Sequence, residues 1–183
     1  MRAIATMLGL ILGMTAPLAT AAEKGESAGT IAANSRAALN RLYASSPAAK
    51  ALGAKASGVL VFPKVTKAGL MIGGQFGEGA LLKGGKVVGY YNTTGASYGL
   101  QAGVQTYGYA LFLMNDGAVR SLDAAQGFEV GVGPSVVVMD EGMAKSTTTT
   151  TMKDDIYAFI FGQKGLMAGL GVQGNKITRI NPK

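Results

Sequence analysis

The sequence predicts an α+β fold, with one or two N-terminal amphipathic helices packed on a glycine-rich antiparallel β-sheet or partly closed barrel formed by residues 58–181. Three observations lead to this prediction. Apolar residues between Ser27 and Ala44 recur at helical spacing, and from Val59 onward the apolar period falls to two. The chain also has 28 glycines among 183 residues, which is about twice the usual share of ~7%.

The N-terminus has the three parts of a secretory signal peptide: Met1-Arg2, an apolar run, and small residues ending at Ala21-Ala22. A membrane anchor would need about 20 apolar residues, more than this run offers. We therefore expect residues 1–21 to be a signal peptide and residues 22–183 a single domain, with cleavage after Ala22 as the second choice. Loss of Arg2 lowers the net charge from +7 to +6, and we expect an exported protein of the periplasm or cell envelope.

Two helices are predicted next. Between Ser27 and Ala44, one face collects apolar side chains at Ile31, Ser35 or Ala38, Leu39, Leu42 and Tyr43. A second, alanine-rich helix is expected to start at Ser46 as N-cap with Pro47 in the first turn, and to end before Gly58.

About eight or nine strands follow. The chain should turn at Lys83-Gly84-Gly85-Lys86 and at Asn115-Asp116-Gly117, and Pro63 should end the first strand. Thr147 to Thr151 could be an edge strand or a mobile loop. The expected strands are 59–62, 70–75, 80–82, 87–91, 98–104 and 107–114 as one bent strand or a pair, 128–132 running on after Pro134 into 136–139, 156–161, 166–172 and 177–180.

A glycine-flanked pentapeptide occurs three times, at residues 69–73, 99–103 and 165–169. In a strand, its two glycines share one face. That face could be tightly covered by a helix or a second sheet, or it could line a ligand groove.

The composition excludes much chemistry. Without His or Cys, the chain can form no thiolate or imidazole metal site, no disulfide and no Ser-His or Cys-His dyad. We expect no catalytic residues, no metal, no cofactor and no enzyme activity. Gly169 to Gly174 matches G-x-G-x-x-G, but no helix and no acidic residue follow as dinucleotide binding requires.

The basic residues indicate an acidic partner. They are dispersed, which argues against nucleic acid, and anionic phospholipid headgroups are the more accessible partner for an exported protein. The alternative is that these side chains only keep a glycine-rich fold soluble. Lys50, Lys55, Lys64 and Lys67 are the ones that lie near one another in the sequence.

Several segments together resemble the SYLF domain. They are Ala56 to Pro63, Gly69 to Gly79, Gly127 to Val138, and Asp155 to Phe159 followed by Lys164 to Gly169 and Gly174 to Ile177. The resemblance runs from about Ala32 to Ile180. It implies a lipid-binding module, known in eukaryotic relatives for phosphoinositide binding and in yeast relatives for actin binding.

Both the resemblance and the charge pattern place lipid contact in the N-terminal segment, at Arg36, Arg41, Lys50 and Lys55, with Lys64 and Lys67 on the following loop. The predicted function is non-catalytic, peripheral association with anionic phospholipid or phosphoinositide headgroups at the cell envelope. The alternative is an envelope structural or protein-interaction module without specific lipid recognition. Export argues against actin, and protein partners stay unidentified. Lys83, Lys86, Lys176 and Arg179 are expected to lie farther from the helices.

Overall fold

The computed structural model describes residues 25–124, 127–130, 133–139, 153–164 and 175–183, which contain three helices and six strands. Five predictions fall outside these ranges: the signal peptide, the threonine run, the strand at 166–172, the third pentapeptide and the G-x-G-x-x-G match. No helix in the described ranges is long and apolar enough to cross a membrane.

The two predicted N-terminal helices are confirmed. Helix α1 spans Ala28–Ser45, and the side chain of Ser27 caps it by accepting a hydrogen bond from the N–H of Thr30. Helix α2 spans Pro47–Gly53, with Ser46 as N-cap and proline in the first turn. The buried face of α1 contains the predicted residues other than Tyr43, which is half-buried, and it also contains Ala32. The buried residues are Ile31, Ala32, Ser35, Ala38, Leu39 and Leu42.

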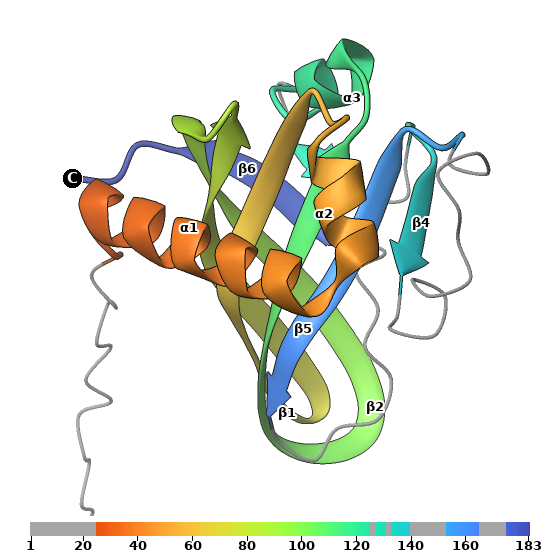
Figure 1. Ribbon diagram of the computed structural model, residues 1–183. Coiled ribbons are helices and arrows are strands. Elements are labelled where there is room, and N and C mark those ends of the chain that lie inside the picture. The colour runs from red at the N-terminus through yellow and green to blue at the C-terminus, as the bar shows by residue number, and fades with distance from the viewer. Residues whose placement is uncertain (1–24, 125–126, 131–132, 140–152, 165–174) are drawn as a thin grey trace, which may run out of the picture.

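Strands β1 (Gly58–Lys83) and β2 (Lys86–Leu113) form one long antiparallel hairpin. The predicted turn between them is confirmed. Gly84 and Gly85 have φ of 54° and 78°, the left-handed geometry that suits a two-residue hairpin turn. The hairpin curls back on itself, and Figure 1 shows this curl at the bottom of the molecule.

The prediction of one bent strand over 98–104 and 107–114 is confirmed by β2. The prediction of separate short strands elsewhere in this region was wrong, because 59–62, 70–75 and 80–82 join in β1 and 87–91 joins the bent strand in β2. Pro63 does not end β1; the strand passes it with a register shift between Phe62 and Val65. The first two pentapeptides pair with each other, Gly69 opposite Gly103, beside another register shift. Such irregularities let a strand bend without ending.

The remaining strands add to the two halves of β2. Strand β6 (Lys176–Ile180) pairs with residues 90–94 of β2 and also with β3 (Phe128–Glu129). Strand β5 (Ile156–Lys164) pairs with residues 106–113 of β2 and also with β4 (Val136–Met139). All pairs are antiparallel except β4 with β5. The curled, mostly antiparallel sheet confirms the predicted α+β class and partly closed barrel.

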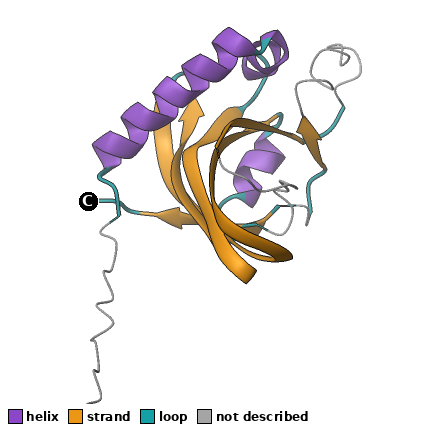
Figure 2. Ribbon diagram, turned by 90° about the horizontal axis from the view of Figure 1, so that it is seen from below, coloured by secondary structure: helices purple, strands orange, loops and turns teal. Residues whose placement is uncertain are grey.

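The predicted turn at Asn115 was also wrong, because this residue begins a third helix. The Asn115 side chain accepts a hydrogen bond from the N–H of Ala118 at 2.8 Å and so caps α3 (Asp116–Ser121). Viewed from below, α3 lies at the far end of the curled sheet (Figure 2). Its buried Val119 joins the core inside that sheet.

Two hydrophobic cores lie on opposite faces of β1. Leu60 and Phe62 face the inside of the curled sheet, whereas Val59 and Val61 pack with apolar side chains of α1 and α2. All four side chains are buried. This explains why the segment is a continuous apolar run: a strand covered on both faces needs no polar side.

Candidate functional site

A groove of about 440 Å³ lies between α1, α2 and the β1–β2 turn, and we call it the basic groove. Each wall comes from a different element: α1 supplies Arg36, α2 supplies Lys50, and the turn supplies its two glycines. Its lining residues are Arg36, Leu39, Asn40, Tyr43, Lys50, Gly53, Ala54, Ala56, Gly58, Val59, Leu82, Gly84 and Gly85.

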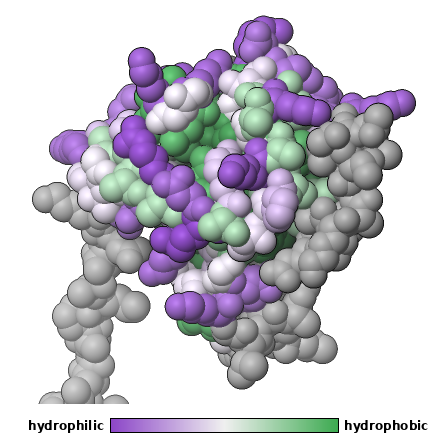
Figure 3. Space-filling model, in the orientation of Figure 1, coloured by the Kyte–Doolittle hydropathy of each residue, from purple (hydrophilic) through white to green (hydrophobic). Residues whose placement is uncertain are grey.

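The basic groove combines an apolar floor with positive charge. Arg36 and Lys50 are exposed, and none of the lining residues is acidic. Lys83 and Lys86 are exposed and directly flank the two lining glycines of the turn. Figure 3 shows an apolar area on this face, edged by hydrophilic side chains. Such a surface suits a ligand that has both a negative group and an apolar part.

Tyr43 is the titratable lining residue whose environment shifts its pKa. Burial raises that pKa above the usual value of 10.0. The ring packs against Phe112 at a centroid distance of 6.3 Å, and a side chain at Gly53 would collide with the Tyr43 hydroxyl. The phenol therefore stays protonated at neutral pH and adds no negative charge to the groove.

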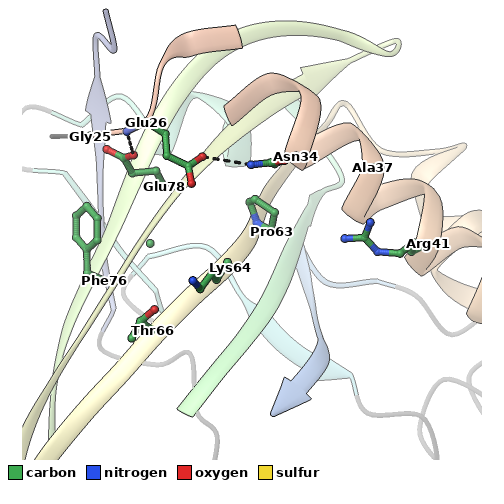
Figure 4. A pocket seen from close by; sticks show the side chains of 11 residues that line it. Gly25, Glu26, Asn34, Ala37, Arg41, Pro63, Lys64, Thr66, Phe76 and Glu78 are labelled. Atoms are coloured by element: carbon green, nitrogen blue, oxygen red, sulfur yellow. Dashed lines mark hydrogen bonds between the residues drawn. The ribbon is translucent and has the colours of Figure 1, made fainter. Parts of the chain in front are cut away.

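A second groove, of about 520 Å³, lies on the other side of α1, and we call it the mixed-charge groove (Figure 4). Its walls come from α1, from both halves of β1 and from the chain before α1. It contains Arg41 and Lys64 together with two carboxylates. Its lining residues are Gly25, Glu26, Asn34, Ala37, Arg41, Pro63, Lys64, Thr66, Phe76, Gly77 and Glu78.

The structure distributes the predicted site residues over both grooves. Arg36 and Lys50 line the basic groove, Arg41 and Lys64 line the mixed-charge groove, and Lys55 and Lys67 line neither. Lys64 and Lys67 do not lie on a loop as predicted, since β1 continues through both. The predicted set is therefore not one cluster.

The four basic residues that were expected to lie farther from the helices also differ in their surroundings. Lys83 and Lys86, expected to lie far from the helices, flank the basic groove, because the curl of the hairpin brings its turn back to α1. Arg179 is already engaged: it forms an ion pair with Asp123 at 3.1 Å and lies 5.9 Å from the Tyr91 ring centroid. The signal that could have found the two lysines is the Lys-Gly-Gly-Lys turn, which places both side chains at one exposed tip.

No group of three or more acidic residues that could hold a metal ion occurs in the part of the chain that the structure describes. The arrangement of both grooves supports binding through charge and apolar contact.

The curled sheet, with α1 and α2 on its outer face and two charged grooves beside α1, defines the α+β fold of this chain. Residues 94–181 match the family model described as Ysc84, Las17-binding protein actin regulator. The match confirms the SYLF resemblance over the second half of the chain. It begins within β2, after the residues that line both grooves. A search of curated proteins found no match.

Proposed function

We propose that this protein is a non-catalytic module that binds anionic phospholipid headgroups peripherally, through the face formed by α1, α2 and the β1–β2 turn. The observation that carries the proposal is the basic groove: two exposed cations over an apolar floor, with no acidic lining residue. A basic side chain near an anionic membrane surface contributes about 1 kcal/mol to binding. Arg36, Lys50, Lys83 and Lys86 can therefore act together.

The same face offers apolar contact with a membrane. Leu39, Val59 and Leu82 line the basic groove, so a lipid whose phosphate meets Arg36 or Lys50 can place its glycerol and upper acyl atoms against them. The SYLF resemblance supports the same proposal, because it implies lipid binding. We propose no preference for phosphoinositides, since the groove requires only negative charge beside apolar surface.

The proposed place of action is the periplasm or cell envelope. This part of the proposal rests on the N-terminal sequence features of a signal peptide. The absence of catalysis is proposed because the sequence has neither His nor Cys to form the common nucleophilic dyads.

A second candidate is a protein-interaction module without lipid recognition. The family description, which names an actin regulator, favours this candidate. Export would separate the protein from actin, so a partner of this kind would have to be an envelope protein. The two candidates differ in whether pure lipid is a sufficient ligand.

Co-sedimentation with vesicles tests the proposal. We expect binding to phosphatidylcholine vesicles that contain phosphatidylglycerol, little binding to phosphatidylcholine alone, and stronger binding as salt falls, because exposed charge contacts are screened by salt. Equal sedimentation with both vesicle types would contradict lipid recognition. Failure to sediment at low salt would do so as well.

A charge-matched pair of variants tests the site. Replacing Arg36 and Lys50 by glutamine should weaken binding by about 2 kcal/mol, roughly thirtyfold. The control replaces Arg120 and Lys176, which are also exposed but line neither groove. If both double variants lose the same affinity, the attraction is a diffuse effect of net charge and the basic groove is not the site.

A further inference from the structure

The two carboxylates of the mixed-charge groove lie at one end of it. Glu26 and Glu78 lie together beside the start of α1, Arg41 lies away from them along the helix, and Lys64 lies apart from Arg41 on β1 (Figure 4). The one ion pair among the described residues joins Arg179 to Asp123, so none of these four charges is neutralised by a partner within the described fold.

Hydrogen bonds hold the acidic end in place. One carboxylate oxygen of Glu78 accepts the backbone N–H of Glu26 at 2.9 Å. One carboxylate oxygen of Glu26 accepts the side-chain amide of Asn34 at 3.3 Å. Each carboxylate keeps a second oxygen that no described residue engages. The groove thus presents two fixed acceptors with negative charge to a cationic donor.

Arg41 lies two helical turns away from the acidic end. Asn34 and Arg41 both come from α1 and are seven residues apart, which corresponds to about 10 Å along the helix axis. Lys64 lines the groove from β1, apart from Arg41 (Figure 4). No ion pair joins these acidic and basic residues, and a short molecule with a positive group and a negative group could contact both the carboxylates and Arg41.

We propose that the mixed-charge groove binds a short zwitterion that joins a primary ammonium group to a phosphate, which is the chemistry of a phosphoethanolamine headgroup. The ammonium would donate hydrogen bonds to Glu26 and Glu78, and the phosphate would accept hydrogen bonds from Arg41. A quaternary ammonium has no N–H to donate, and quaternary groups are favoured by aromatic cages rather than paired carboxylates. A purely anionic headgroup would be repelled at the acidic end.

The groove is positioned for a headgroup that is still part of a membrane lipid. It shares α1 as a wall with the basic groove, so a membrane lying on α1 would reach both. Phe76, which is 45% exposed, lines the groove and could contact the acyl region. The inference that the bound zwitterion belongs to a membrane lipid rests on the proposed function. The inference that the groove binds a zwitterion does not.

A soluble probe tests the chemistry without a membrane. In a nuclear magnetic resonance titration, the protein should bind glycerophosphoethanolamine saturably and bind glycerophosphocholine about tenfold more weakly. Glu78→Gln and Arg41→Gln should each raise the dissociation constant about tenfold, because each removes one charge-assisted contact. Glu129→Gln and Arg120→Gln remove exposed charges outside the groove and should change nothing.

Three results would overturn this site. They are no saturable binding of glycerophosphoethanolamine by the unaltered protein, equal affinity for the choline probe, and equal effects of the groove variants and their controls. The side-chain carbonyl in Glu78→Gln can still accept a hydrogen bond from the Glu26 N–H, so this variant should remain folded. An unchanged melting temperature checks this, and Arg41→Gln, exposed on α1, provides an independent test of the other end.

Vesicles then separate the lipid source from a free solute. Adding phosphatidylethanolamine to vesicles of phosphatidylcholine and phosphatidylglycerol should strengthen binding severalfold for the unaltered protein and not for Glu78→Gln. Phe76→Ala should weaken vesicle binding without changing affinity for the soluble probe. If glycerophosphoethanolamine binds but phosphatidylethanolamine has no effect, the ligand is a soluble zwitterion and the lipid source is wrong. If phosphatidylglycerol vesicles fail to bind while the soluble probe binds, the proposed function fails and the groove stands.

Discussion

At the scale of single residues, the glycines of β1 show where the sheet closes on itself. The two halves of this strand approach so closely that a Cβ at Gly77 would lie 2.7 Å from Val65 Cγ2. A Cβ at Gly79 would collide with the carbonyl oxygen of Val61. The sequence predicts that strand glycines mark bends or close approaches, but it does not say which glycine meets which segment, since that depends on the curl.

We expect Gly79→Ala to destabilise the protein by roughly 1–3 kcal/mol or more, because the added methyl group must displace backbone. The matched control is Gly74→Ala, in the same strand, where the nearest atom to a built Cβ is 4.0 Å away. Urea unfolding of both variants measures the difference. Equal losses of stability would show that general strand flexibility, and not close approach, is the reason for Gly79.

Two buried tyrosines inside the curled sheet predict a loss of stability at alkaline pH. Tyr107 donates a hydrogen bond to Gln75 at 2.8 Å, and Tyr109 donates one to Thr93 at 2.6 Å. Burial raises the pKa of Tyr107 to about 12 and raises that of Tyr109 further. The raised pKa means that folding favours the protonated phenol. This stabilisation is complete below the ordinary pKa near 10 and is lost as the pH rises through 12.

Absorbance of ionised tyrosine near 295 nm, followed together with far-ultraviolet circular dichroism, measures this effect. The late-titrating tyrosines should ionise together with unfolding between about pH 10 and 12, and Tyr107→Phe should reduce the amplitude of the late phase. Complete tyrosine ionisation near pH 10 with the fold intact would contradict the buried positions.

At the scale of elements, local signals predicted the helices well and the strand ends poorly. Capping by Ser27 and Ser46 depends on neighbouring residues, so the starts of α1 and α2 could be predicted. Pro63 was expected to end a strand, but a bulge in a long hairpin accommodates it. Asn115 is suited both to a turn and to a helix N-cap, and burial of Val119 inside the sheet stabilises the helix. The period of two cannot show whether adjacent segments join into one strand.

One hydrogen bond ties α1 to β1, and it gives a prediction. The buried Ser35 hydroxyl donates to the Val61 carbonyl at 3.2 Å, on the side of β1 that faces the helix. Ser35→Ala should cost about 1–3 kcal/mol, because it leaves a buried carbonyl without its donor. Chemical denaturation measures this cost, and Ser45→Ala, which changes an exposed serine of the same helix, is the control. A similar midpoint for both variants would contradict the role of Ser35.

At the scale of the whole molecule, the site depends on contacts that the sequence could not provide. Charge and amphipathicity identified Arg36, Arg41 and Lys50, because positions on a helix follow from spacing. They could not show that Arg36 and Arg41 face different grooves, since each groove is completed by β1. Glu26 and Glu78 are 52 residues apart and meet through the fold alone.

The return of the hairpin turn to α1 changes which lysines should matter for membrane binding. Replacing Lys83 and Lys86 by glutamine should weaken binding to phosphatidylglycerol vesicles by up to about 2 kcal/mol. Replacing Lys176 and Arg120 should weaken it less. Sedimentation at several salt concentrations measures both effects. A larger loss of affinity from the second pair would show that the contact surface lies away from the turn.

The long hairpin also has a consequence for the rate at which the chain folds. Its pairing starts at Lys83 and Lys86 and ends at Gly58 and Leu113, so each new pair closes a loop only slightly larger than the loop already closed. Formation of the turn is therefore an early, local event, and docking of α1 on β1 follows. Gly85→Ala, which strains a φ of 78°, should slow refolding and leave the unfolding rate nearly unchanged. The two glycines that border the basic groove would thus also set the kinetics of the whole sheet.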